Sequence, residues 1–315
     1  PRWPFSLLYL ACSERPPPQA TPMPPDILTP DQLDHYRAYG YVALRNFVAA
    51  AEVAALRQEI DRLIAHAPVA RGADADATGS PVAHPRDFAF SDGDGTQVLN
   101  RISRPLLHSD VVLRSYGHPR LLGAARDLYG DGLVPFAESI VIKLPQRGAP
   151  FAWHQDGSFK SGAVPERGVN FGLYLHEARE ANGCLFVVPK SHEQGRIDIS
   201  ALIAAPGGRP RGAIPVEAAP GDVLVHSRNL VHGSFANTSP DPRVTVYFGY
   251  HARATVAGIY EEAHIERRRQ AIALAVRRRQ RSGLFPGEVP FDYPVDQVQA
   301  EEARDEVLQT PPLAV

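Results

Sequence analysis

Apolar residues recur at helical spacing in the first 130 residues of the chain. Thr29 followed by Pro30 is typical of a helix N-cap and first helical position. The spacing predicts helices over 30–39, within 50–66 and over about 104–130. We expect a strand over 41–47 between the first two helices. Ala, Gly, Asp and Pro dominate residues 67–96, which predicts a long surface loop or a lid.

The pattern changes at about residue 133, where short apolar segments begin to alternate with Gly and Pro turn signals. This pattern predicts strands over 137–144, 150–155, 168–177, 183–188, 214–217, 222–226, 230–236 and 243–252. Many short strands with regular turns indicate a mostly-β protein with flanking helices, built on a double-stranded β-helix (jelly-roll, cupin-like) core over about 133–255. A basic helix is predicted over 261–281. The acidic residues beside its arginines favour a solvated, salt-bridged face or an oligomer contact over a nucleic-acid site.

The organisation of the chain follows from these elements. We expect one domain over 26–300 and a C-terminal tail over 301–315. Residues 1–25 are rich in proline and carry no period, so we expect a disordered extension. We interpret Met23, the only methionine, as the natural start and residues 1–22 as an upstream extension. A weak signal peptide is the alternative, but its apolar run from Trp3 to Ala11 is interrupted and barely preceded by basic charge.

The charge and cysteine content exclude several classes of protein. Lys and Arg number 33 against 35 Asp and Glu, so nothing indicates a nucleic-acid or membrane-surface partner. No apolar run approaches the roughly 20 residues that a membrane span needs. Cys12 and Cys184 lie far apart and do not suggest a disulfide framework. We expect a cytoplasmic protein with a small-molecule partner, and the sequence leaves oligomer formation open.

Two histidines and a carboxylate are the strongest candidates for chemistry. His154 and Asp156 stand two apart at a strand end, so their side chains point to one face. His232 follows in a later strand, and Gly233 after it allows close approach. A mixed nitrogen and oxygen ligand set without thiolate suits Fe(II) with open coordination positions. His226 is a rival ligand, but its surroundings favour a core residue or a neighbour of the ligands, and we expect His176, His192 and His251 to be structural.

Three segments together resemble the phytanoyl-CoA dioxygenase family of Fe(II)- and 2-oxoglutarate-dependent oxygenases. They are Trp153-His154-Gln155-Asp156, the stretch from Asn182-Gly183 to Ser191-His192, and His232-Gly233-Ser234 followed by Asn237, Ser239 and Arg243. The resemblance covers about residues 26–255. The chain departs from the family pattern at Lys190, where glycine is usual, but this position lies in a loop away from the candidate ligands.

The resemblance implies a role for each matching residue. His154, Asp156 and His232 would bind iron. Arg243 would pair with the distal carboxylate of 2-oxoglutarate, helped by the hydroxyl of Thr245. Lys143 either contacts the co-substrate or is an exposed strand lysine. The candidates for residues around the ligands or in the pocket wall are Trp153, Gln155, Asn170 and Ser234.

The implied reaction consumes 2-oxoglutarate and O₂, releases succinate and CO₂, and oxidises a small molecule. Related halogenating enzymes have a small residue in place of the carboxylate, so Asp156 favours hydroxylation, desaturation or ring closure. We expect the substrate to contact 67–100, 157–167 and 190–213. Two alternatives stay open: a jelly-roll protein that binds a metal or ligand without turnover, and a zinc isomerase or hydrolase of cupin type.

Overall fold

The computed structural model describes residues 26–93, 96–156, 168–205, 207–295 and 303–313. The expectations for 1–25, including Met23 as the start and the signal-peptide alternative, fall outside the described residues, as does the expected substrate contact of 157–167. In the part of the chain that the structure describes, no helix combines the length and apolar character that a bilayer crossing requires.

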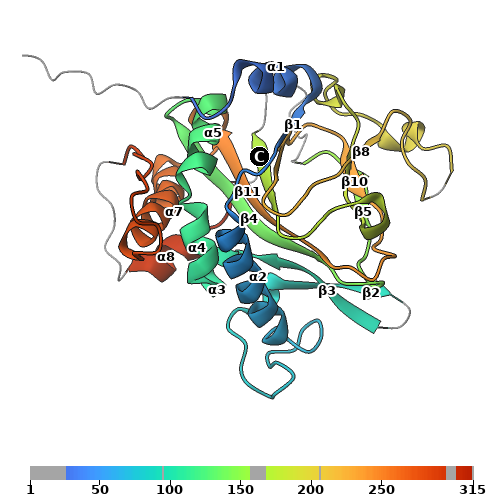
Figure 1. Ribbon diagram of the computed structural model, residues 1–315, viewed down its shortest axis with the longest axis horizontal. Helices are drawn as coiled ribbons and strands as arrows, with labels where there is room; N and C mark the ends of the chain where they lie inside the picture. The colour runs from blue at the N-terminus through green and yellow to red at the C-terminus, as the bar shows by residue number, and fades with distance from the viewer. Residues whose placement is uncertain (1–25, 94–95, 157–167, 206, 296–302, 314–315) are drawn as a thin grey trace, which may run out of the picture.

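Two antiparallel sheets face each other in the molecule (Figure 1). The larger sheet has the strand order β1-β9-β6-β11-β4-β3-β2, and the smaller sheet has the order β5-β10-β7-β8. The strands are β1 (Tyr41–Leu44), β2 (Phe88–Gly93), β3 (Thr96–Ser103), β4 (Leu133–Lys143), β5 (Phe151–His154), β6 (Val169–Tyr174), β7 (Leu185–Val187), β8 (Ile214–Val216), β9 (Val223–Ser227), β10 (His232–Ser234) and β11 (Arg243–Ala252). This arrangement confirms the predicted jelly-roll core.

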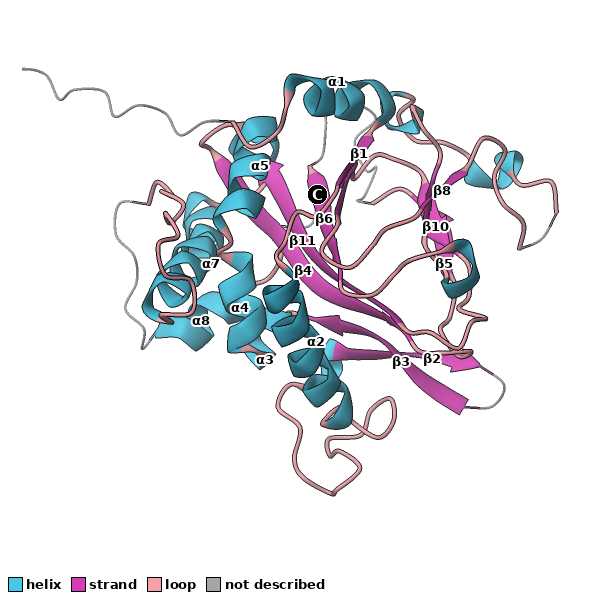
Figure 2. Ribbon diagram, viewed as in Figure 1, coloured by secondary structure: helices cyan, strands magenta, loops and turns pink. Residues whose placement is uncertain are grey.

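Helices cover the outer face of the larger sheet, on the side away from the smaller one (Figure 2). The described helices are α1 (Pro30–Tyr39), which packs on the edge strand β1, α2 (Ala50–Ala65), α3 (Pro105–His108), α4 (Asp110–Tyr116), α5 (Pro119–Tyr129), α6 (Arg253–Val256), α7 (Glu262–Arg281) and α8 (Arg304–Gln309). Short 3-10 turns occupy Pro85–Asp87, Glu180–Asn182, Ser191–Glu193 and Ile199–Leu202. The inner face of the larger sheet is thereby left to the smaller sheet.

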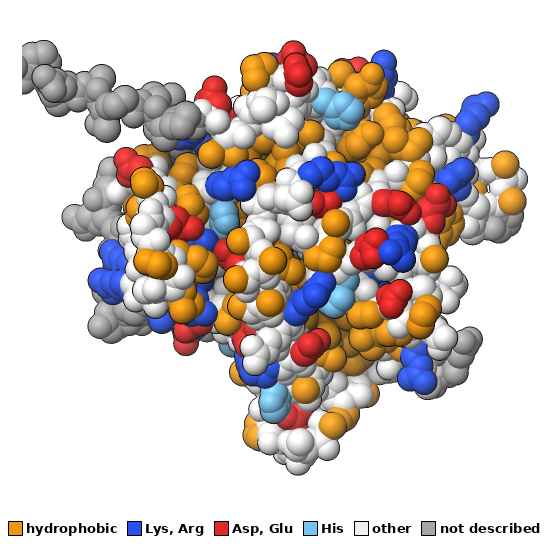
Figure 3. Space-filling view, viewed as in Figure 1, with side chains coloured by type: hydrophobic (Ala, Val, Ile, Leu, Met, Phe, Trp, Pro, Cys, Tyr) orange, Lys and Arg blue, Asp and Glu red, His pale blue; other side chains and the backbone are white. Residues whose placement is uncertain are grey.

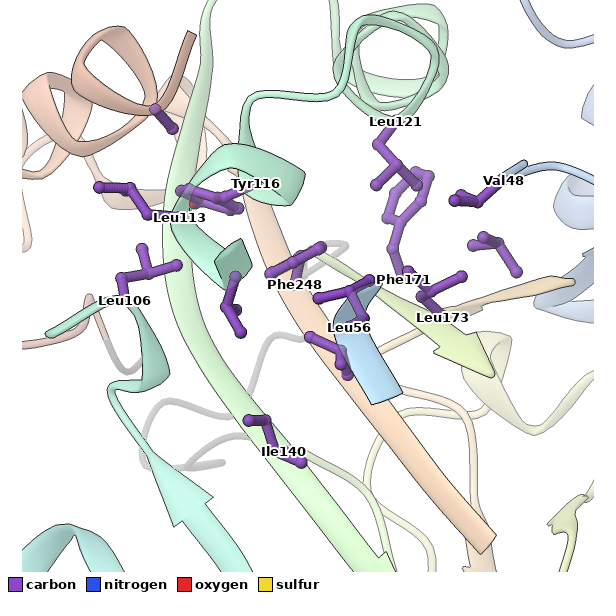
Figure 4. Packing of buried hydrophobic residues seen from close by; sticks show 14 of the residues in the cluster. Val48, Leu56, Leu106, Leu113, Tyr116, Leu121, Ile140, Phe171, Leu173 and Phe248 are labelled. Atoms are coloured by element: carbon purple, nitrogen blue, oxygen red, sulfur yellow. The ribbon is translucent and has the colours of Figure 1, made fainter. Parts of the chain in front are cut away.

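The alternation of side chains along β4 separates the core from the inner face. Ile140 and Ile142 are fully buried against the helices, where they join the main apolar cluster. Figure 4 shows Ile140 and Phe248 of the sheet packed with Leu56 and Leu113 of the helices. The intervening side chains of β4 face the smaller sheet because strand neighbours point to opposite faces. Burial of one face therefore fixes which residues are available to a site on the other.

The predicted elements were partly wrong before residue 133. The expected loop over 67–96 contains β2, which forms a hairpin with β3 at the sheet edge. The expected helix over 104–130 is three helices, because Ser109 caps α4 and Pro119 starts α5 after a break. In contrast, α1 has the predicted bounds, with a capping box between Thr29 and Gln32, and β11 has the predicted bounds as well.

Two arginines of α7 are buried and so depart from the prediction of a solvated face. Arg268 is buried and lies 2.5 Å from the buried carboxylate of Glu138 in β4. Arg279 is also buried and bridges Glu52 of α2, at 2.7 Å, and Glu288, at 2.6 Å. These pairs attach α7 to the sheet and to α2. On the face that Figure 3 shows, basic side chains are interspersed with acidic ones.

Candidate metal centre

His154 and His232 are direct cross-strand partners in the smaller sheet. His154 is the last residue of β5 and His232 is the first of β10, and their ring centroids lie 4.2 Å apart. Asp156, two residues beyond His154, is held by a hydrogen bond from its backbone N–H to the carbonyl of Arg228, at 2.8 Å. Its carboxylate oxygens lie 3.4 Å from Nε2 of His154 and 3.7 Å from Nε2 of His232.

These three side chains can bind one metal ion. Their ligand atoms all lie within 4.8 Å of one another. Nδ1 of His154 lies 2.7 Å from the carbonyl oxygen of Ala152, and Nδ1 of His232 lies 2.9 Å from that of Leu230. A carbonyl oxygen only accepts hydrogen bonds, so each Nδ1 carries the proton and each Nε2 presents its lone pair. Two imidazole nitrogens and one carboxylate match the facial ligand set of non-haem iron.

The charges at the centre suit metal binding. Burial would raise the pKa of Asp156, but His232 and His154 beside it hold that pKa far below its usual value. Burial and the neighbouring His154 lower the pKa of His232 to about 4. Burial disfavours the charged form of His154, yet the hydrogen bond and charge of Asp156 outweigh it and raise the pKa of His154. At neutral pH the carboxylate is therefore ionised and His232 is neutral, as ligands must be.

Asn170 and His226 surround the carboxylate. Asn170 lies in β6 and donates from Nδ2 to the Oδ2 atom of Asp156, at 2.7 Å, and its Nδ2 lies 3.3 Å from Nε2 of His226. The His226 ring is buried, and its centroid lies 4.7 Å from that of the His232 ring. Burial and the neighbouring His232 lower the pKa of His226 to about 3. His226 therefore lies beside the ligand group, outside the three side chains that converge.

Arg243 and Thr245 present unsatisfied polar atoms at the start of β11. Arg243 is 1% exposed, and its guanidinium contacts the hydroxyl of Tyr174 at 3.3 Å. Within the described ranges, neither Nε of Arg243 nor Oγ1 of Thr245 has a hydrogen-bond partner. Buried polar groups normally have hydrogen-bond partners. The unsatisfied Nε of Arg243 and Oγ1 of Thr245 therefore indicate an anionic, hydrogen-bond-accepting ligand. A carboxylate of 2-oxoglutarate has this chemistry.

Lys143 is the cross-strand partner of Arg243 but makes different contacts. Its side chain is fully buried, so the alternative of an exposed strand lysine is wrong. Its ammonium group donates to the carbonyls of Ala149 and Phe235, both at 2.6 Å. Burial and the charge of Arg243 lower the pKa of Lys143 to about 6. Lys143 thus joins the segments that follow β4 and β10, and its ammonium is not among the groups that line the cavity.

A cavity of about 160 Å³ lies between the two sheets at this centre. Its lining includes six of the predicted site residues: His154, Asp156, Asn170, His232, Ser234 and Arg243. Thr245 of β11 and Lys143 of β4 lie on strands that contribute to the cavity wall, but neither residue lines the cavity. The remaining lining residues are Arg101, Phe136, Ala137, Ser139, Val141, Phe151, Leu185, His226, Gly233 and Tyr247.

Trp153 and Gln155 point away from the cavity, as alternation along the strand requires. Trp153 donates from its indole nitrogen to the carbonyl of Gly208, at 3.1 Å. Gln155 donates to the carbonyls of Gly195 and Asn229, at 2.8 and 2.6 Å. Both side chains hold neighbouring segments against the ligand strand, so neither forms the pocket wall.

Two of the three histidines that we expected to be structural, His192 and His251, contact backbone carbonyl oxygens. Nε2 of His192 lies 3.1 Å from the carbonyl oxygen of Arg37, and Nε2 of His251 lies 3.0 Å from that of Leu313. His176 is half-buried, and burial lowers its pKa. None of the three lines the cavity.

Sequence reasoning missed Arg101, Tyr174 and Tyr247. Tyr247 follows Thr245 by two positions and so shares its face, which the strand period signals. Tyr174 is the register partner of Thr245 in β6, and Arg101 is the register partner of Val141. Such cross-strand neighbours carry no signal in the sequence.

Comparison with known proteins agrees with this geometry. The phytanoyl-CoA dioxygenase family model matches residues 36–245. An ectoine dioxygenase from Bordetella parapertussis is 26% identical over 257 residues, covering 72% of this chain and 76% of its own. A probable alpha-ketoglutarate-dependent hypophosphite dioxygenase from Stutzerimonas stutzeri is 26% identical over 243 residues, covering 70% and 78%.

Solved structures share the fold. The crystal structure of EctD from S. alaskensis with bound Fe has a TM-score of 0.57 and 25% identity, covering 73% of this chain and 79% of that chain. The family match spans about two thirds of the chain and includes the three converging ligands. These findings exclude the alternatives of a non-catalytic jelly roll and a zinc isomerase or hydrolase. The chain therefore belongs to the phytanoyl-CoA dioxygenase family and is an iron- and 2-oxoglutarate-dependent dioxygenase.

Proposed function

We propose that His154, Asp156 and His232 bind ferrous iron, that Arg243 with Thr245 binds the distal carboxylate of 2-oxoglutarate, and that the enzyme hydroxylates or otherwise oxidises a small molecule. One observation carries this proposal. The orphaned Nε of buried Arg243 belongs to a side chain that lines the same cavity as the three ligand side chains. Among the described residues no carboxylate pairs with Arg243, and a free cation beside a metal-binding triad is the arrangement that a chelating keto acid requires.

Iron with 2-oxoglutarate and O₂ supplies, when bound, the oxidative decarboxylation that yields succinate and CO₂ and oxidises the substrate. The protein orients and shields these partners. The backbone carbonyls of Ala152 and Leu230 set the imidazole tautomers, and Asn170 orients the carboxylate of Asp156. Arg243 fixes the far end of the keto acid, and the apolar side chains in the wall limit access of water.

The relatives support a small-molecule substrate. Their names refer to ectoine and to hypophosphite. The presence of Asp156 supports hydroxylation, desaturation or ring closure over halogenation, because halogenating relatives have a small residue in place of this carboxylate. We therefore propose a small metabolite as substrate.

Anaerobic loading tests the proposal directly. Adding Fe(II) and 2-oxoglutarate to the metal-free protein without oxygen should produce a visible metal-to-ligand charge-transfer band. Admitting O₂ should then yield succinate. Zn(II) is the control, since it binds the same ligand types but gives no such band. The absence of the band with Fe(II) would contradict the assigned iron and co-substrate sites.

A further inference from the structure

Arg101 is a cation in the cavity wall that the iron and co-substrate sites do not use. It lies in β3, pairs in register with Val141 of β4, and Val141 in turn pairs with Thr245 of β11. Its side chain therefore shares the inner face with Thr245, and it lines the cavity. Two strand spacings of about 4.8 Å separate β3 from β11, so the backbones at Arg101 and Thr245 lie roughly 10 Å apart, and Arg243, two residues along β11 from Thr245, lies further from Arg101. The side chains of Arg101 and Arg243 thus enter the cavity wall from different positions.

No carboxylate of a described residue forms an ion pair with Arg101. A contrast is Arg104, three residues later, which donates twice to Asp87 at 2.9 and 2.7 Å. The guanidinium is therefore open to a ligand on the iron side of the cavity.

The charges of the loaded centre balance without Arg101. Ferrous iron and Arg243 contribute three positive charges, and 2-oxoglutarate and Asp156 contribute three negative ones. Among the described residues of the wall, Arg101 is the remaining charged side chain apart from the histidines. Arg101 lines this cavity but is itself exposed to solvent, so its positive charge can attract an anion that enters from solution.

The surroundings of Arg101 define the rest of the ligand. Phe136, Val141, Phe151 and Leu185 supply apolar wall on both sheets. An apolar wall with one positioned cation is typical of a site for an amphiphilic molecule. Resting on the function proposed above, we propose that Arg101 binds a carboxylate or phosphate group of the substrate, whose apolar body packs on these side chains beside the iron. The enzyme would thereby select organic anions.

Three matched probes test this proposal: hexanoate, hexyl phosphate and neutral hexanamide. Each is titrated without oxygen into wild-type enzyme saturated with Fe(II) and 2-oxoglutarate, and the shift of the charge-transfer band reports binding without turnover. A charge-assisted hydrogen bond predicts that at least one anion binds about ten- to a hundredfold more tightly than the amide. The two anions distinguish a carboxylate substrate from a phosphate one.

The variants assign that preference to Arg101. Arg101→Gln should remove it while leaving the band and the affinity for 2-oxoglutarate unchanged, and Arg101→Lys should restore part of it. Arg37→Gln, an exposed arginine on α1, should keep the preference. Equal binding of anions and amide, binding of none of the probes, displacement of 2-oxoglutarate by the anions, or an unchanged preference in Arg101→Gln would overturn the proposal. A wild-type enzyme without the band would instead refute the iron and co-substrate sites.

Discussion

The side-chain amide of Asn170 donates a hydrogen bond of 2.7 Å to the Oδ2 atom of Asp156. This bond joins β6 of the larger sheet to the residue that follows β5 of the smaller one. It leaves Oδ1, which lies 3.4 Å from Nε2 of His154, as the less restrained oxygen. The orientation of the carboxylate that we propose as an iron ligand therefore depends on a residue of the opposite sheet.

Replacing Asn170 with Ala should weaken Fe(II) binding by about ten- to a hundredfold, because residues that orient a metal ligand have effects of this size. Asn170→Asp should be at least as harmful, since it places a like charge against Asp156. A competition titration with a calibrated chelator under anaerobic conditions measures the affinity. Unchanged iron affinity in both variants would show that the amide does not orient the ligand.

Replacing Asp156 with Ala should abolish succinate formation, because the iron loses its only anionic protein ligand. The measurement is succinate produced from 2-oxoglutarate with Fe(II) and O₂. Asp34→Ala, which removes an exposed carboxylate on α1, serves as the control and should retain full turnover. Undiminished succinate production by Asp156→Ala would contradict the ligand assignment.

Replacing Arg243 with Gln should raise the dissociation constant of 2-oxoglutarate by about 30-fold or more, since a buried charge pair is lost. Arg243→Lys should have an intermediate effect because lysine keeps the charge but lacks the planar fork. The charge-transfer band, titrated with 2-oxoglutarate, measures the constant. Arg253→Gln, just beyond the opposite end of β11, should bind 2-oxoglutarate normally, and a matching loss there would point to a general effect on the strand.

The affinity for Fe(II) should fall as the pH falls through the pKa of His154. Burial lowers this pKa, but Asp156 overcomes that effect and raises it above the ordinary histidine value. Below the raised pKa iron must displace a proton, so the affinity should decrease by about tenfold per pH unit and level off above it. His232, with a pKa of about 4, adds no dependence near neutrality. Iron titrations between pH 6 and 8.5 that give a flat profile would show that His154 is not protonated there.

Replacing Arg279 with Met should destabilise the fold by about 3–5 kcal/mol, because Glu52 would be left as a buried charge without its partner. Chemical denaturation measures the free energy of unfolding. Adding Glu52→Gln should recover part of the loss. The neighbouring Arg278→Met changes a more exposed residue, paired with Asp110 at 3.5 Å, and should cost less than about 1 kcal/mol. If Arg279→Met and Arg278→Met lowered the free energy of unfolding equally, burial of the Arg279–Glu52 pair would not explain its contribution to stability.

Much of the candidate site could be predicted from the sequence because its signals are local. His154 and Asp156 share a face through the strand period, and Gly233 after His232 allows the close approach of Trp153, whose ring would lie 2.9 Å from an added Cβ. The bounds of β11, which begins at Arg243, follow from a run rich in β-branched and aromatic residues that starts just after Pro240 and Pro242. These features depend on neighbours in the chain.

Other features depend on contacts between distant segments, and only the tertiary structure decided them. The strand β2 lies in a stretch that is rich in loop-forming residues, and its pairing with β3 determines its conformation. Lys143 has the same local pattern whether exposed or buried, yet the carbonyls of Ala149 and Phe235 surround its ammonium. Arg101 reaches the cavity because β3 joins the sheet beside β4. The sequence determined which side chains share a strand face, whereas cross-strand register decided which of them meet, because it joins residues as far apart in the chain as Tyr41 and His226.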